Sequence, residues 1–158
     1  MTSVLILLLL LALSVFFSAS ETAMFSADRV RLRTLSQKGN ASAALAEKLR
    51  AKPRILLGAI LLGSNVVTIS ASALTTIIAV QTLGNWAVGA ATGILTIIVI
   101  IFSEFLPKAW ATHSGERAAL LVAKPVYFLT VAVGPIIRLL DLATSRMVGA
   151  NGDGIHAV

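Results

Sequence analysis

Two acidic residues, Glu21 and Glu104, stand at the ends of long apolar runs and are the first candidates for chemistry. The run 4–17 leads into Glu21, and the run 86–102 leads into Glu104. An ionised side chain inside hydrocarbon is energetically costly, so a carboxylate at that depth requires a compensating partner. A carboxylate near a helix end can also extend to the membrane surface, and this alternative stays open for both residues.

Hydroxyl and amide side chains gather on one face of the second apolar run. At about 100° per residue, the polar side chains of the run 55–80 fall within an arc of roughly 120°. They are Ser64, Asn65, Thr68, Ser72, Thr75 and Thr76. In the third run, Gly89 and Gly93 lie on the same side as Glu104, and their small-xxx-small spacing lets another helix approach closely. A single hydroxyl of this kind more often bonds to its own backbone or to a neighbouring helix than to a ligand.

The first run presents its polar residues differently. Ser18 and Ser20 lie about 200° apart on an ideal helix, so either one of them is idle or the helix opens between them. The small residues there permit an opening, which would release carbonyl oxygens of the kind that bind cations in transporters. Pro107 has a similar effect on the third run, because it cannot donate to the carbonyl of Ser103 beside the second carboxylate.

The collected side chains offer only oxygen ligands. The sequence has no cysteine, and both histidines, His113 and His156, lie outside the apolar runs and are expected to face solvent. Hydroxyl, amide, carbonyl and carboxylate oxygens suit the hard cations Mg²⁺, Ca²⁺ and Na⁺, whereas zinc, copper and iron sites normally include His or Cys. The pattern predicts a hard-cation site. It does not favour an enzyme, because we find no nucleophile–base pair and no glycine-rich phosphate loop.

The composition requires a membrane around these residues. Hydrophobic residues form 57% of the 158 residues and charged residues only 13%, and the mean hydropathy is +0.91. A soluble domain has about 25% charged residues, so a soluble globule is excluded. Each apolar run extends to the roughly 20 residues that a bilayer requires, which predicts spans at 4–24, 55–79 and 86–107. The first run lacks a basic leader and is expected to be a span, not a cleaved signal peptide.

The placement of charge predicts the orientation. Basic residues cluster between positions 29 and 54, whereas the loop 81–85 carries no charge. By the positive-inside rule the basic segment is cytoplasmic, so the N-terminus is outside and the C-terminus cytoplasmic. Basic residues beside a membrane normally reflect topology and contact with anionic lipid, so no nucleic-acid partner is expected.

The segments outside the spans predict helices at the membrane surface. Residues 26–53 alternate apolar and charged residues around Gly39-Asn40, which is typical of a helical hairpin. In residues 118–147, Lys124-Pro125 and Pro135 favour a kinked pair of interfacial helices, although a fourth span at 118–133 stays an alternative.

These elements together predict an all-α integral membrane fold. It has three spanning helices, and the juxtamembrane helices form a belt on the cytoplasmic side. Residues 1–148 make up this transmembrane domain. Residues 149–158 have the composition of a linker or of a truncated tail.

Three short motifs follow one another along the chain. They are Ser-Ala-Ser-Glu-Thr-Ala at 18–23, Gly-Ser-Asn-Val-Val at 63–67 and Ser-Glu-Phe-Leu-Pro-Lys at 103–108. Each motif is weak alone, but their order and separation make the combination specific. With the basic hairpin and the Lys124-Pro125 segment, they resemble the transmembrane domain of the CorC/cyclin-M (CNNM) family of magnesium transporters over nearly the whole chain.

The resemblance implies a homodimer in the cell membrane that binds Mg²⁺ between polar helix faces and exports it, with Na⁺ as the coupling ion. Carried over by motif, the ligands of the largely dehydrated ion would be Ser18, Ser20, Ser64, Asn65 and Glu104, with Glu21 and Ser70 as secondary candidates. Pro107 and Lys108 would shape the cytoplasmic end, with Lys108 paired to an acid.

Members of this family usually carry a cytosolic pair of CBS domains that bind ATP and a further C-terminal domain. We expect this chain to be the membrane domain alone, with those domains in the full-length protein. A second interpretation stays open: a membrane anchor and dimerisation module for a missing cytosolic regulatory part, in which the polar stripes only pack helices. Packing explains the glycines and many hydroxyls, but it does not explain a carboxylate beside a carbonyl freed by proline.

Overall fold

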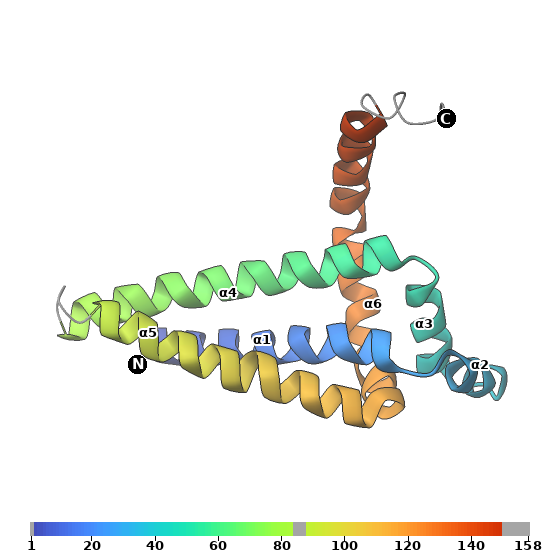
Figure 1. The fold of residues 1–158 in the computed structure, drawn as a ribbon, viewed down its shortest axis with the longest axis horizontal. Helices are drawn as coiled ribbons and strands as arrows, with labels where there is room; N and C mark the ends of the chain where they lie inside the picture. The colour runs from blue at the N-terminus through green and yellow to red at the C-terminus, as the bar shows by residue number, and fades with distance from the viewer. Residues whose placement is uncertain (1, 84–87, 150–158) are drawn as a thin grey trace, which may run out of the picture.

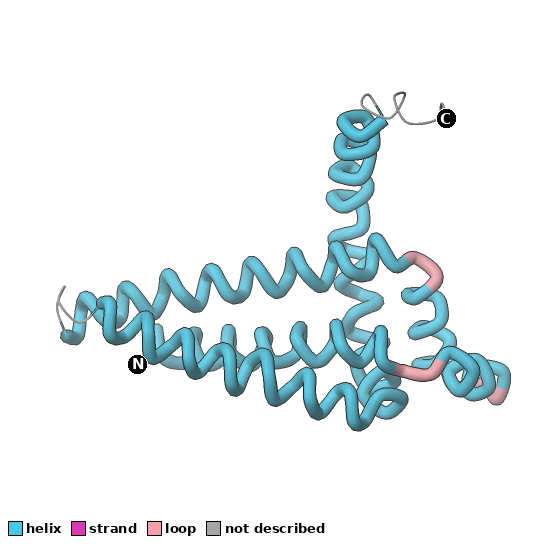
Figure 2. Tube along the Cα trace, in the orientation of Figure 1, coloured by secondary structure: helices cyan, strands magenta, loops and turns pink. Residues whose placement is uncertain are grey.

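The computed structural model describes residues 2–83 and 88–149, and within them the chain is helical apart from short turns (Figure 1, Figure 2). Three stretches are long and apolar enough to cross a membrane: Thr2–Ser26, Pro53–Thr82 and Val88–Ile137. The described residues contain no strand. The predicted all-α membrane fold with three spans is therefore confirmed.

The spans pack against one another in sequence order. α1 (Thr2–Ser26) contacts α4 (Pro53–Leu83), which contacts α5 (Val88–Ile98). α5 continues into the π-helix η2 (Val99–Phe105) and then into α6 (Leu106–Gly149). Figure 1 shows these spans side by side, with the later part of α6 crossing them. Positions 86 and 87 of the third predicted span lie outside the described residues.

The third span changes its helical form near its polar end. The N–H of Leu106 donates to the carbonyl of Ile101, five residues earlier, which is the π-helical pattern. Pro107 follows in a continuous helix and cannot donate a bond to the preceding turn, yet the chain stays helical past this residue. Gly115 (φ 4°, ψ −76°) departs from helical geometry and turns the chain. Beyond it, α6 remains one helix through Pro125 and Pro135, where the sequence predicts a kinked pair.

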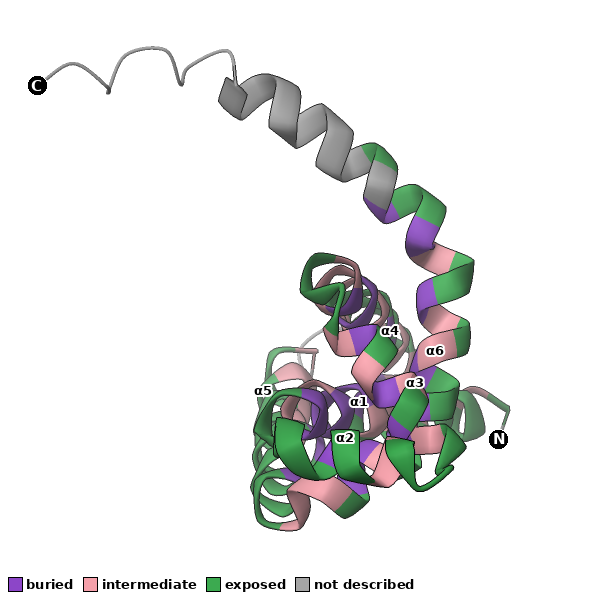
Figure 3. Cartoon of the chain, turned by 90° about the vertical axis from the view of Figure 1, so that its right-hand side faces the viewer, coloured by how far each residue is buried: buried purple, intermediate pink, exposed green. Residues whose placement is uncertain are grey.

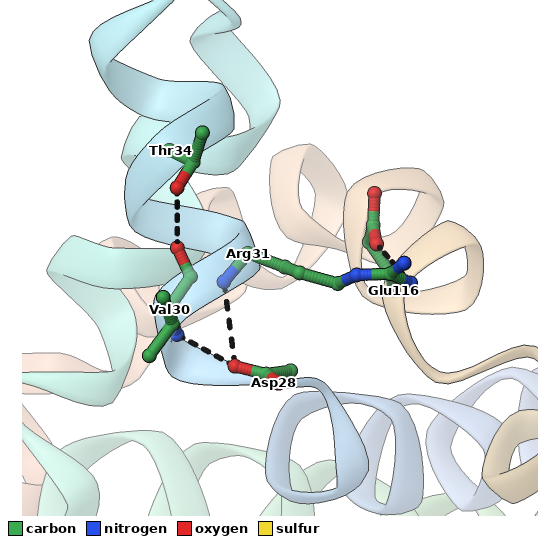
Figure 4. A network of polar contacts seen from close by, with 5 residues as sticks. All are labelled: Asp28, Val30, Arg31, Thr34 and Glu116. Atoms are coloured by element: carbon green, nitrogen blue, oxygen red, sulfur yellow. Dashed lines mark hydrogen bonds and ion pairs between the residues drawn. The ribbon is translucent and has the colours of Figure 1, made fainter.

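A basic helical hairpin joins the first two spans. α2 (Arg29–Gln37) begins at Asp28, whose carboxylate accepts from the backbone N–H groups of Val30 at 2.7 Å and Arg31 at 3.3 Å (Figure 4). α3 (Ala41–Arg50) begins at Asn40, whose side chain accepts from the N–H of Ala43. Both are N-caps, which satisfy donors that a helix leaves unpaired.

The turn between α2 and α3 depends on one glycine. Gly39 has φ +87°, a left-handed conformation that favours residues without a β-carbon. The far end of the hairpin is fixed by Arg50, whose Nη1 donates to the carbonyl of Ala27 at 2.6 Å. Burial lowers the pKa of the Arg50 guanidinium, and the charge of Arg29 lowers this pKa further, while Asp28 opposes both effects.

The hydrophobic core lies where the hairpin meets α1, α4 and α6. Small residues allow close helix contact there, and α6 contributes a regular buried face. That face consists of Ala118, Ala119, Val122, Ala123 and Val126. Large apolar side chains lie on the outside of the spans, among them Leu5 at 65% and Ile69 at 69% exposure. Figure 3 shows exposed residues on the outer sides of the helices and buried residues between them. An apolar surface of this kind is suited to contact with the hydrocarbon core of a bilayer.

Arg31 ties the hairpin to the bend in α6. Its Nη1 lies 3.3 Å from the Oε2 of Glu116, the residue that follows Gly115 (Figure 4). At the same bend, the hydroxyl of Ser26 donates to the carbonyl of Ala111 at 3.4 Å. The hairpin, the end of α1 and the turn of α6 are therefore connected at one end of the spans.

Candidate cation site

The first and third predicted motifs meet through a direct hydrogen bond. The Ser18 hydroxyl donates to the backbone carbonyl of Glu104 at 3.1 Å, across 86 residues of sequence. Ser18 is buried at 6% exposure, and the neighbouring Ser103 is buried at 2%. The polar end of α1 and the π-helical segment are therefore in contact, as the pattern of polar residues requires.

The π-helix and Pro107 act on the same carbonyl groups. Proline has no N–H, so it cannot donate to Ser103, its partner in an α-helix, or to Phe102, its partner in a π-helix. Pro107 is itself buried. The π-helical segment therefore has a widened turn, and Pro107 gives it no N–H donor. Its backbone oxygens lie close in sequence to the Glu104 carboxylate and can bind a ligand. π-Helical turns inside α-helices frequently mark functional sites.

The second motif lies against the first through a glycine. A β-carbon on Gly63 would lie 2.5 Å from the Cε1 and Cζ atoms of Phe17, so the ring occupies the space that a side chain would need. This contact brings Gly63, the first residue of the second motif, beside Phe17, which precedes the first motif. Ser64 is half-buried, whereas Asn65 is exposed.

The contact between Phe17 and Gly63 was not predicted from the sequence. Its signal is a glycine inside the run 55–80, which often marks close approach of another element. In membrane helices, small residues at contacts allow backbones to come together.

The carboxylate of the proposed ligand set belongs to an exposed residue. Glu104 is exposed in the single chain, and so is the secondary candidate Ser70. The described residues contain no group of three or more His, Cys, Asp or Glu side chains that could hold a metal. Any cation bound by these residues would therefore depend on neutral oxygens together with one carboxylate.

Ser20 decides between the two alternatives for α1. The helix is unbroken from Thr2 to Ser26, and the Ser20 hydroxyl donates to the carbonyl of Phe16 at 2.7 Å, four residues earlier. The alternative in which one of the two serines is idle is therefore the one observed, and the helix does not open, because this internal bond satisfies the side chain within an intact helix. Ser18 and Ser20 are both fully packed, but they address different partners.

An ion pair connects the two acidic motifs at their ends. Lys108 Nζ lies 3.3 Å from Glu21 Oε2, with side-chain exposures of 46% and 34%. The resemblance implied an acid as the partner of Lys108, and the structure identifies that acid as Glu21. The pair joins α1 to α6 just beyond the contact between Ser18 and Glu104.

Two threonines of the polar stripe on α4 bond to their own helix. Thr75 donates to the carbonyl of Ala71 at 2.8 Å, and Thr76 donates to that of Ser72 at 3.1 Å. On α5, Thr96 bonds in the same way to Thr92. These threonines follow the simpler interpretation, in which the hydroxyl bonds to its own backbone.

The remaining predicted positions are uncovered in the single chain or lie outside the described residues. No atom of another described segment lies within 4 Å of a β-carbon built on Gly89 or on Gly93, so the face they share is free in the single chain. His113 is exposed, as expected. His156 lies outside the described residues.

The fold defines a three-span integral membrane domain with a basic hairpin at one end. The family model described as the cyclin M transmembrane N-terminal domain matches residues 5–157. This chain therefore belongs to the CNNM transmembrane domain family, as the resemblance indicated.

Curated relatives agree with this assignment. The chain is 39% identical over 147 residues to a UPF0053 protein of Haemophilus influenzae, covering 93% of this chain and 35% of the relative. It is 40% identical over 144 residues to the UPF0053 inner membrane protein YfjD of Escherichia coli, covering 89% and 34%. The chain thus spans about a third of these relatives, and it is a multi-pass membrane protein.

A more distant relative carries a functional name. The polyamine export protein of Escherichia coli K12 is 22% identical over 195 aligned residues, which cover all of this chain and 41% of the relative.

Proposed function

We propose that this domain transports Mg²⁺ out of the cell in exchange for Na⁺, as part of a homodimer. The observation that supports the proposal most is the 3.1 Å hydrogen bond from Ser18 to the Glu104 carbonyl. It joins the two motifs whose oxygens are the expected ligands, inside a membrane domain of the CNNM family. The N-terminus is proposed to lie outside and the C-terminus in the cytoplasm, since the basic hairpin follows the positive-inside rule.

The chemistry of the residues suits a small hard cation. In the proposed site Glu104 supplies the negative charge, while Ser18, Ser64 and Asn65 supply neutral oxygens that replace hydration water. Ser20 was in the predicted ligand set, but its hydroxyl bonds to its own helix, so it is the member that fits least. Mg²⁺ requires nearly octahedral oxygen ligands at about 2.0–2.1 Å, so a rigid set of protein oxygens favours it over the larger Ca²⁺. Glu21 and Ser70 are assigned secondary roles, because Glu21 already pairs with Lys108 and Ser70 lies off the polar arc of its helix.

A second copy of the chain would complete the surroundings of this site. Glu104 and Asn65 are exposed in the single chain, and Gly89 and Gly93 offer an uncovered face. Covering these residues with a partner would shield a carboxylate that is costly to leave in hydrocarbon. In the full-length protein, CBS and C-terminal domains would follow on the cytoplasmic side and regulate the transporter.

The test is Mg²⁺ binding to the purified domain, measured by calorimetry. Glu104→Gln keeps the side-chain size and removes the charge, and it is expected to abolish binding. Glu47→Gln, on α3 and outside the spans, is the matched control and is expected to bind like the unaltered protein. Unchanged affinity in Glu104→Gln would remove that residue from the site.

The anchor function is the second candidate, and the bonding of the hydroxyls favours it. Thr75, Thr76 and Thr96 are satisfied by their own helices and need no ion. Proteoliposomes that contain only this chain separate the two functions. A transporter moves Mg²⁺ in response to a Na⁺ gradient, whereas an anchor gives no flux beyond that of protein-free liposomes.

The distant polyamine export relative suggests a different cation for the same experiment. A polyamine carries several separated amines, and binding it would favour several carboxylates. Within the predicted spans 4–24, 55–79 and 86–107 the acidic residues are Glu21 and Glu104, and Glu21 pairs with Lys108. We therefore favour Mg²⁺, and spermidine flux in the same proteoliposomes is the comparison. Spermidine transport without Mg²⁺ transport would replace the proposed substrate.

A further inference from the structure

A cavity of about 300 Å³ lies at the junction of α3, α4 and α6, away from the candidate cation site. Two lysines stand at it, Lys48 on α3 and Lys52 in the turn before α4. The opposite walls come from the first turn of α4 and from the middle of α6. They are formed chiefly by Ile55, Leu56, Tyr127, Val131, Gly134 and Pro135.

Two contacts between the surrounding helices lie near the cavity. Lys48 Nζ, from α3, donates to the hydroxyl of Tyr127 on α6 at 3.3 Å and lies 5.1 Å from the centre of that ring. Further along, α4 and α6 meet so closely that a β-carbon on Gly58 would lie 3.1 Å from the Cγ2 atom of Ile137. The cavity therefore lies between helices that are in direct contact.

The position of the cavity relates it to the membrane surface. α4 begins at Pro53, so Ile55 and Leu56 belong to the first turn of a spanning helix, while Lys48 and Lys52 precede it. This level is where lipid headgroups give way to hydrocarbon. α6 also exposes large apolar side chains beside the cavity, including Phe128 at 73% and Val131 at 58%. These side chains are suited to contact with acyl chains.

The lining matches a molecule that is anionic at one end and apolar at the other. The cavity has two ammonium groups and no carboxylate among its lining residues. Basic pockets between helices at the membrane surface are a known way to bind anionic lipid headgroups. Contact with Tyr127 already orders Lys48, which lowers the entropy lost when a phosphate binds. A soluble anion would gain nothing from the apolar wall.

We propose that this cavity binds an anionic phospholipid, with the lipid phosphate at Lys48 and Lys52 and the upper part of an acyl chain on the wall formed by α4 and α6. The lipid joins α6 to the start of α4 and to the hairpin. This role is independent of which ion the domain transports.

The experiment is native mass spectrometry of the chain in a non-ionic detergent, titrated with dioleoyl phosphatidylglycerol or dioleoyl phosphatidylcholine. We expect the anionic lipid to bind preferentially. The double variant Lys48→Gln, Lys52→Gln is expected to weaken it roughly thirtyfold, from about 1 kcal/mol for each lysine. The matched control, Lys38→Gln with Lys124→Gln, removes the same charge from residues outside the lining and is expected to change affinity less than threefold. Equal losses in the two pairs would overturn the proposal.

A second pair of variants tests the cavity without changing charge. Gly134 lines the cavity, and no other segment lies within 4 Å of a β-carbon built there, so a side chain has room. Gly134→Phe is expected to fill the space and abolish preferential binding, while Gly134→Ala retains it. This pair decides the question if the lysine variant does not fold. Equal binding of both lipids, retained binding in Gly134→Phe, or displacement by excess inorganic phosphate would each overturn the proposal.

Discussion

The contact between Gly63 and Phe17 predicts different responses to two similar substitutions. In a helix interior, Gly→Ala normally stabilises by about 0.5–1 kcal/mol, because glycine loses more backbone freedom. At Gly63 the added β-carbon would lie 2.5 Å from the Phe17 ring, which is 7% exposed and packed edge-on against Phe16. At Gly134 the same methyl group meets no other segment within 4 Å.

The two alanine variants therefore differ chiefly in the clash. Gly134 precedes Pro135, so an alanine there gains less helix propensity than an alanine at Gly63. Their difference is therefore a lower bound on the cost of overpacking, which is about 1–3 kcal/mol. For a chain of this size a cost in that range corresponds to roughly 2–12 °C in the unfolding midpoint. We expect Gly63→Ala to unfold at the lower temperature and Gly134→Ala to unfold close to the unaltered protein.

The assay is thermal unfolding of the purified chain in detergent without Mg²⁺, followed by circular dichroism. The combined variant Gly63→Ala, Phe17→Leu removes the ring that the methyl group meets, and it should recover most of the difference. If Gly63→Ala is as stable as Gly134→Ala, α1 and α4 do not approach as described. The motif at 63–67 would then not lie beside Ser18.

Three further predictions concern polar contacts. Ser18→Ala should destabilise the Mg²⁺-free domain by about 0.5–1.5 kcal/mol, because it removes a bond between helices, whereas Ser20→Ala should change unfolding little; equal effects would contradict the assigned partners. Lys108→Met should cost under about 1 kcal/mol, since both members of its pair with Glu21 are partly exposed, and a larger loss in denaturant unfolding would indicate an unrecognised role. Arg31→Glu should weaken the contact between α2 and α6 in low salt, so that the hairpin is proteolysed faster. Adding Glu116→Arg should restore the original rate, and absence of this rescue would argue against the ion pair.

The spans and the hairpin could be predicted from sequence because their signals are local. A bilayer demands long apolar helices, and the chain supplies three. The turn between α2 and α3 is marked by Gly39, which adopts a left-handed φ, and by Asn40, which caps the next helix. These residues act on neighbours a few positions away, so one sequence is enough to find them.

The path of α6 could not be predicted because packing overrides a local rule. A proline inside a helix costs about 3 kcal/mol or more in propensity and a lost hydrogen bond, which favours a break at Pro125 and Pro135. The buried face from Ala118 to Val126 packs against the core and offsets this cost. The bend falls instead at Gly115, where the hairpin and the end of α1 meet α6.

A contact between two motifs of the candidate site was predictable, but the geometry of the site was predictable only in part. The residue types pointed to oxygen chemistry, and the contact between Ser18 and Glu104 joins two of the predicted motifs. The π-helix at 99–105 adds a residue to one turn and shifts every later side chain, which ideal helical spacing cannot anticipate. The bond from Ser20 to Phe16 likewise depends on a rotamer choice, and no periodicity reveals it.

The central claim is that oxygens from α1, α4 and the π-helical segment together hold a divalent cation. Its most direct test is a crystal structure with Mn²⁺ in place of Mg²⁺, because Mn²⁺ accepts the same octahedral oxygen ligands and can be located by anomalous scattering. The account predicts one peak per protomer, bound by the Glu104 carboxylate with oxygens from the Ser18 and Asn65 segments. A peak elsewhere, or a Glu104 carboxylate directed away from those segments with no ion beside it, would contradict it.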